Sequence, residues 1–146
     1  MGSTHSAIDL RGELKTRLNE ARARTDEIFS LLTPAAMFER PIAERHRMIF
    51  YLGHVEAFDW NLIARRAAKV EPFHPEFDKL FAFGIDPVGG GLPTDQPSDW
   101  PERARIDAYN RRVRETVDRV LEGADLNGAT RSSIVDSPSR WGSSTG

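Results

Sequence analysis

The sequence predicts an all-α fold, and three observations lead to this prediction. Three segments place apolar residues three or four positions apart, which is the spacing of one face of an amphipathic helix. No segment alternates apolar and polar residues for long enough to predict a strand. The 146 residues, 39% hydrophobic and 29% charged, have the size and balance of one globular domain. We therefore expect a helical bundle of antiparallel neighbours over residues 6–123.

The first predicted helix covers about residues 8–32. Its apolar residues fall three, four or seven positions apart, and arginines and glutamates take the remaining faces. We expect this apolar row to face the core of the bundle. Thr33 ends the helix because the proline that follows pushes it out of the helical region. The row consists of Leu10, Leu14, Leu18, Ala21, Ile28 and Leu31.

The second predicted helix begins after Pro41 and covers about residues 44–68. Its apolar row is expected to face the core, and His54 lies on that row. The residues that follow, 71–97, are rich in proline and glycine, and only residues 74–83 are predicted to form a short helix. The row consists of Tyr51, Val55, Phe58 and Leu62, with Met48 one turn earlier.

The third predicted helix begins near residues 98–101, where a serine or an aspartate can cap the first amide groups. Its apolar row is spaced three, four, four and three. Residues 124–146 have a different composition, with many serines and few apolar residues, which predicts a disordered tail. The sequence thus provides three strong helices where a bundle ordinarily uses four. The third row consists of Ile106, Tyr109, Val113, Val117 and Val120.

Composition and charge exclude several classes of protein. The net charge is −2, so no basic field points to a nucleic-acid partner. Nowhere do eighteen apolar residues run together, so we expect no membrane partner. The chain has no cysteines, which excludes disulfides and thiolate metal ligands and fits a cytoplasmic protein.

Among the four histidines, His54 is the candidate site residue. His5 lies in a terminal segment, His46 lies among charged residues, and His74 has the position of a loop or helix-cap residue. An imidazole on an apolar row either forms a hydrogen bond within the core or binds a metal ion. A metal site usually needs three or more protein ligands, and the chain contains no HxxxH pair. Both interpretations therefore stay open by spacing alone.

The residues around His54 resemble the second helix of the DinB-like superfamily. The most similar subgroup is the N-terminal module of ergothioneine-type sulfoxide synthases. In their pattern, an aromatic residue is followed by a small residue, a histidine and a phenylalanine, which here are Phe50 or Tyr51, Gly53, His54 and Phe58. The resemblance covers about residues 8–122, and the other matching features are Arg22, Arg24 and Thr25, the segment 77–93, and Tyr109 and Arg114.

This resemblance implies a four-helix bundle that binds iron(II) or another divalent metal through three histidines. His54 matches the first histidine. The other two form an HxxxH pair on the fourth helix of the family, and this sequence has no such pair. In the synthases, a larger second domain supplies most of the substrate pocket, and the metal uses oxygen to join a thiol to a histidine-derived betaine. The resemblance therefore assigns His54 as a metal ligand and assigns no catalytic or cofactor-binding residue.

These observations predict an inactive remnant of such an N-terminal domain, with weak or absent metal binding. The alternatives are a non-catalytic helical interaction domain and a relative of the DinB-type thiol-dependent transferases. Two origins would explain the missing pair: a natural truncation, or a change of reading frame beyond Leu121 that makes residues 124–146 an out-of-frame tail. An HxxxH pair in another frame of the downstream coding DNA would support the second origin.

An incomplete bundle leaves an apolar face without a partner helix. At ~25 cal/mol per Å², several hundred Å² of uncovered apolar surface cost on the order of 10 kcal/mol, which is comparable with the stability of a whole domain. We therefore expect marginal stability and self-association through the exposed face of the bundle.

Overall fold

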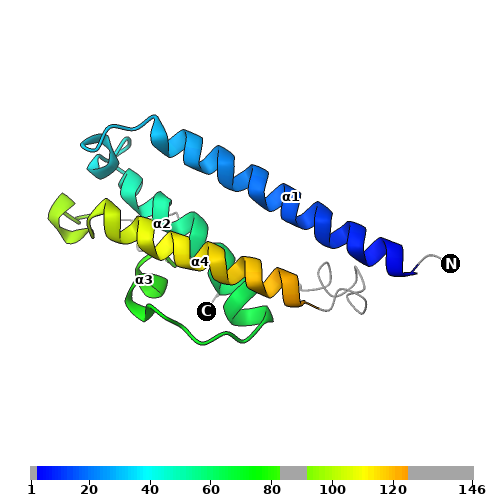
Figure 1. Cartoon of the computed structure of the whole chain (residues 1–146). Helices are drawn as coiled ribbons and strands as arrows, with labels where there is room; N and C mark the ends of the chain where they lie inside the picture. Colours follow the sequence, from blue (N-terminus) through cyan, green and yellow to red (C-terminus); the bar gives the residue numbers. More distant parts are fainter. Residues whose placement is uncertain (1–2, 83–91, 125–146) are drawn as a thin grey trace, which may run out of the picture.

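The computed structural model describes residues 3–82 and 92–124, and within these ranges all regular structure is helical (Figure 1). The all-α prediction is confirmed. Two helices are long, and α2 continues directly into a segment with π-helical hydrogen bonds. In chain order the elements are α1 (Ser3–Ser30), η1 (Ala36–Phe38), α2 (Met48–Asp59), η2 (Trp60–Ala67), α3 (Pro75–Leu80), η4 (Pro97–Asp99) and α4 (Arg103–Gly123).

The helix α4 contacts both α1 and α2, and it runs antiparallel to α1 and parallel to α2 (Figure 1). Asp26 of α1 pairs with Arg114 and Arg22 pairs with Asp118, so residue numbers fall along α1 as they rise along α4. Two hydrogen bonds connect α4 with α2: Asn110 donates to the Leu52 carbonyl, and Arg114 donates to Glu56. In both bonds the partners are 58 positions apart in the sequence, so residue numbers rise together along the two helices. The helices α2 and α4 are therefore parallel. The expectation of antiparallel neighbours holds for α1 and α4 and is wrong for α2 and α4.

The core lies where α2, η2 and α3 meet α4. Aromatic side chains fill most of it, and their rings contact one another in edge-on, tilted or stacked arrangements. Aromatic residues bury large apolar areas, so this cluster supplies much of the free energy that holds the elements together. The largest side chains without solvent exposure are Trp60, Phe50, Phe81, Met37, Ile49, Ile106, Val113 and Val117.

Most of the predicted core row of the second helix faces solvent, although Tyr51 of that row is partly buried against the core. Val55, Phe58 and Leu62 are 41%, 59% and 47% exposed. The buried side of α2 carries Ile49, Phe50, Leu52, Gly53, Glu56 and Ala57. This helix is apolar around most of its circumference, so spacing alone could not tell which apolar side packs against α4. The placement of His54 on a core-facing row is therefore corrected: its ring is half-buried, at the border between the two sides.

The predicted row of the first helix is also displaced from the core. Leu10, Leu14, Ile28 and Leu31 are exposed, whereas Leu18 and Phe29 contact the core cluster. The side of α1 that faces α4 carries mostly charged residues, and they hold the two helices together by ion pairs and hydrogen bonds. These residues are Arg11, Lys15, Arg22 and Asp26, with partners on α4 or at its end.

Candidate functional site

The ring of His54 is held by two contacts within the core. It stacks on Phe50, one turn earlier on α2, with ring centres 4.9 Å apart. Its Nδ1 lies 2.7 Å from the carbonyl oxygen of Phe81, just beyond α3. A carbonyl oxygen can only accept, so Nδ1 carries the proton and donates it. The lone pair of the neutral ring is therefore on Nε2.

Gly53 allows Phe81 to approach α2 closely enough for this hydrogen bond. A Cβ atom at position 53 would lie 2.5 Å from Cδ1 and Cε1 of the Phe81 ring, which is too close for any side chain. Gly53, directly before the histidine, thus has a packing role, because the ring of Phe81 rests on its backbone. This close approach brings the carbonyl group of Phe81 within hydrogen-bond distance of the His54 ring.

Replacing Gly53 with alanine is expected to lower the free energy of unfolding by about 1–3 kcal/mol, the usual cost of overpacking a core. The methyl group collides with a ring that is itself fully buried. Chemical denaturation of the purified protein measures the change.

Gly12→Ala is the matched control, because it makes the same substitution in a helix where nothing lies within 4 Å of the new Cβ. Alanine is the better helix former, so this variant should be unchanged or more stable by up to about 1 kcal/mol. Equal effects at the two glycines would contradict the packing role of residue 53.

The remaining histidines do not join His54. His46 stacks on the same phenylalanine, Phe50, with ring centres 4.0 Å apart. His74 caps α3 as its sequence position predicts, because its Nδ1 accepts a hydrogen bond from the backbone amide of Phe77 at 3.3 Å. The side chain of His5 lies outside the described residues. His46 and His54 thus share a stacking partner, whereas His74 belongs to the cap of α3.

The described donors do not fit a complete metal centre. Within residues 3–82 and 92–124, no group of three or more histidine or acidic side chains could hold a metal ion. A first-row metal site usually needs three protein ligands, and the described residues do not bring three together. No reaction step through a metal can be derived from these residues.

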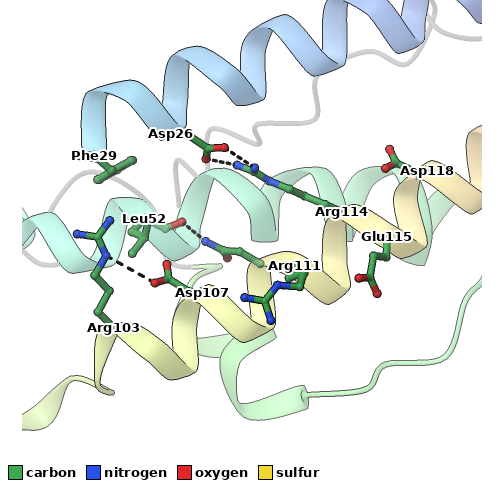
Figure 2. A pocket seen from close by; sticks show the side chains of 10 residues that line it. Asp26, Phe29, Leu52, Arg103, Asp107, Arg111, Arg114, Glu115 and Asp118 are labelled. Atoms are coloured by element: carbon green, nitrogen blue, oxygen red, sulfur yellow. Dashed lines mark hydrogen bonds and ion pairs between the residues drawn. The ribbon is translucent and has the colours of Figure 1, made fainter. Parts of the chain in front are cut away.

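A network of ion pairs beside the core was not found by sequence reasoning. Arg114 of α4 donates from Nε to Oε1 of Glu56 on α2 at 2.7 Å, and it forms two bonds with the carboxylate of Asp26 on α1 at 2.7 and 2.8 Å. Figure 2 shows Arg114 reaching across to Asp26. One guanidinium group thus connects α1, α2 and α4. The spacing of apolar residues did not predict this network. It placed Val55 and Phe58 on the buried side of the second helix, whereas Glu56 is the residue that is buried there.

Burial and charge oppose each other in this network. Desolvation raises the pKa of Glu56, and the hydrogen bond and charge of Arg114 reduce that rise without cancelling it. The hydrogen bond with Arg114 lowers the pKa of the more exposed Asp26. A cavity of about 360 Å³ adjoins the network (Figure 2). Arg114 and Asp26 line this cavity, and their charged groups are paired with each other and, for Arg114, also with Glu56. We therefore assign the network a structural role.

A second charged cluster holds the segment before α4 against α2. The carboxylate of Asp95 accepts hydrogen bonds from Arg40 at 2.6 Å, Arg47 at 3.0 Å and the indole of Trp100 at 2.7 Å. Trp100 in turn packs against the rings of Phe50 and Phe81. The two residues that contact His54, Phe50 through its ring and Phe81 through its carbonyl group, are thus themselves held in place.

None of the described helices is both long enough and apolar enough to cross a membrane.

Comparisons with known proteins agree with the resemblance seen around His54. A sequence profile described as the DinB superfamily matches residues 17–139. Ergothioneine biosynthesis protein 1 of Neurospora crassa is 35% identical over 91 residues, which are 58% of this chain and 10% of that protein. The chain therefore spans about a tenth of the length of this curated relative. These matches confirm the predicted family, while the predicted tail, 124–146, lies outside the described residues except for its first residue.

Proposed function

The chain belongs to the DinB superfamily, and from this premise we propose that it is a helical module of the non-haem-iron sulfoxide-synthase lineage in which His54 is one metal ligand. The similarity to a relative named for ergothioneine biosynthesis supports this lineage. The aligned part is only 10% of that relative. We therefore propose oxidative C–S bond formation as the activity of the intact proteins of this lineage and not of this chain. We propose that this chain by itself does not perform it.

The observation that carries the proposal is the hydrogen bond between His54 Nδ1 and the Phe81 carbonyl. Histidines that bind metals usually donate their other ring N–H to a carbonyl or carboxylate, which fixes the tautomer and the orientation of the ring. Here the bond selects Nε2 as the coordinating atom. Gly53 and Phe81 support this arrangement from the protein side.

A second candidate function starts from the same bond. A half-buried imidazole needs a hydrogen-bond partner whether or not it binds metal, and stacking on Phe50 accounts for the rest of its surroundings. In this interpretation the chain is a non-catalytic helical domain, and His54 is a packing residue. The incomplete donor set among the described residues favours it.

Metal titration separates the two candidates. Under anaerobic conditions, Fe(II) is added to the full chain, and Co(II) serves as a spectroscopic probe in parallel. The proposal expects weak binding that is lost in His54→Ala, because one neutral imidazole cannot hold a first-row ion tightly. His46→Ala is the control, since it removes an imidazole that stacks on the same Phe50. In NMR spectra, Co(II) should broaden the His54 ring signals first.

Each result has a defined meaning. Weak binding that His54→Ala leaves unchanged rejects His54 as a ligand and supports the packing role. Tight stoichiometric binding, or C–S bond formation by the purified chain, rejects the proposal that this chain is inactive alone.

A further inference from the structure

We propose that a second copy of this chain packs antiparallel along α1, through the exposed apolar residues of α1 and the alternating charges beside them. We call the apolar set the α1 row, which consists of Leu10, Leu14, Ala21 and Ile28. The charged set consists of Glu13, Arg17, Glu20 and Arg24. This interface is independent of the proposed metal chemistry.

The α1 row is exposed because α1 turns a different side towards α4. Leu10, Leu14 and Ile28 are 39%, 37% and 59% exposed, and Leu31 beyond them is 80% exposed. In an ordinary amphipathic helix this row would face the core. Here each of these residues directly precedes one that faces the bundle, as Leu14 precedes Lys15, which pairs with Glu122 on α4. One residue is a rotation of about 100° around a helix, so the row points sideways from the α1–α4 contact.

The exposed apolar residues of the α1 row extend along most of the helix, from Leu10 to Ile28. Isolated surface leucines need no explanation, but a row of them along several turns marks a contact surface. A stable interface covers about 800 Å² on each partner, and helix α1, with 28 residues and a length of about 42 Å, is long enough to provide it. A second α1 offers an apolar row of the same length, which makes a further copy of the chain a fitting partner.

The charges beside the α1 row select an antiparallel partner. Glu13, Arg17, Glu20 and Arg24 are all exposed and alternate in sign at spacings of four, three and four residues. The twofold axis crosses α1 at the level between Leu18 and Asn19. Glu13 then meets Arg24 of the other copy, and Arg17 meets Glu20 of the other copy. Leu10 then lies close to Ile28 of the other copy. The symmetry repeats each contact, whereas a parallel in-register pair would bring identical charges to the same level.

The pair between Arg17 and Glu13 within one copy does not prevent this arrangement. Their side-chain atoms are 2.7 Å apart, but both side chains are exposed. Such exposed pairs contribute little and exchange readily, so Arg17 can pair with Glu20 of the other copy at small cost.

Sedimentation equilibrium of the full chain over a wide concentration range tests the proposal. The wild type should show a reversible monomer–dimer equilibrium. Arg24→Glu should raise the dimer dissociation constant by about tenfold or more, since it replaces two symmetric attractions with repulsions. The double variant with Glu13→Arg and Arg24→Glu should recover the wild-type constant, because the exchanged charges again face each other.

Asn19→Glu is the matched control, because it places a new negative charge on the exposed side of α1 away from the α1 row. It should leave the dissociation constant unchanged, and circular dichroism should show the same helix content in all variants. A wild type that stays monomeric at all concentrations overturns the proposal. So does a dimer that Arg24→Glu does not weaken, or one that the charge exchange does not restore.

Discussion

Replacing Arg114 with methionine is expected to lower the free energy of unfolding by about 3–5 kcal/mol at pH 7. The side chain of Glu56 is 4% exposed, and Arg114 contacts its carboxylate at 2.6 and 2.7 Å. Methionine retains most of the apolar volume of the arginine stem and removes the charge. Glu56 is then a buried anion without its partner, which is among the most costly changes that a single substitution can produce.

The loss should depend on pH in a defined direction. Burial already raises the pKa of Glu56 above its usual 4.5, and Arg114 is the main group that reduces the rise. In the folded variant, the Glu56 carboxyl group therefore keeps its proton to a higher pH than it does in the unfolded chain. A folded state that binds more protons loses stability as pH rises. The wild-type pKa of Glu56 is itself raised, so the deficit of the variant should grow with pH above that raised pKa and be smaller at pH 5 than at pH 8.

Urea unfolding of the wild type and the variant at pH 5 and pH 8 measures this difference. Asp26→Asn is the matched control, since it removes the other partner of Arg114, whose side chain is 60% exposed. The control should cost no more than about 1 kcal/mol. Combining Arg114→Met with Glu56→Gln should recover part of the loss, because no buried charge remains. A deficit of the same size at both pH values would contradict the assignment of Glu56 as its source.

Replacing Phe81 with alanine is expected to lower the free energy of unfolding by about 3–5 kcal/mol. The ring has no solvent exposure and contacts Phe50, Phe77, Trp100 and Tyr109. Its removal leaves a cavity in the part of the core where α2, α3 and α4 meet. Such a cavity costs both the transfer free energy of the ring and the contacts that it made.

The same variant should change the effect of the substitution at Gly53. In the wild type, alanine at position 53 collides with the Phe81 ring, whereas in Phe81→Ala the new methyl group enters the cavity. Gly53→Ala is therefore expected to be neutral or stabilising in that background. A double-mutant cycle measures this coupling by chemical denaturation. Additive effects would show that the two residues do not act through this contact.

Phe58→Ala provides the control for the loss of a phenylalanine. Phe58 lies on the same helix as Gly53, but it is 59% exposed and outside the core cluster. Its replacement should cost well under half of the loss at Phe81, because less apolar area returns to water. Comparable losses at the two positions would indicate that the row with Phe58 is buried in solution.

Much of the local structure was predictable from spacing. The first and third predicted helices correspond to α1 and α4, with ends displaced by up to five residues, and His74 caps α3 as its position indicated. The second helix begins at Met48, four residues later than predicted, because Arg47 is extended. Its last turns also adopt the wider π-helical spacing. These differences concern only the ends of helices, where local signals are weakest.

The candidate site was predictable in part. The small residue before His54 was noted as part of a family pattern, but the sequence did not reveal that Phe81 rests on it. The hydrogen-bond partner of His54 is a backbone carbonyl 27 positions away. Such a partner leaves no trace in residue type, so only the folded chain identifies it. The role of His54 as a metal ligand stays a prediction.

The sequence by itself determined the all-α class, the approximate extent of three helices, the family and the choice of His54. Only the tertiary structure decided which sides of those helices are covered. The reason is physical: α2 carries apolar side chains on two sides, and α1 contacts α4 largely through charged residues. A periodic pattern shows that a helix has an apolar side. Which side is buried depends on the partner helix, and here the ion pairs of Arg22 and Arg114 place that partner.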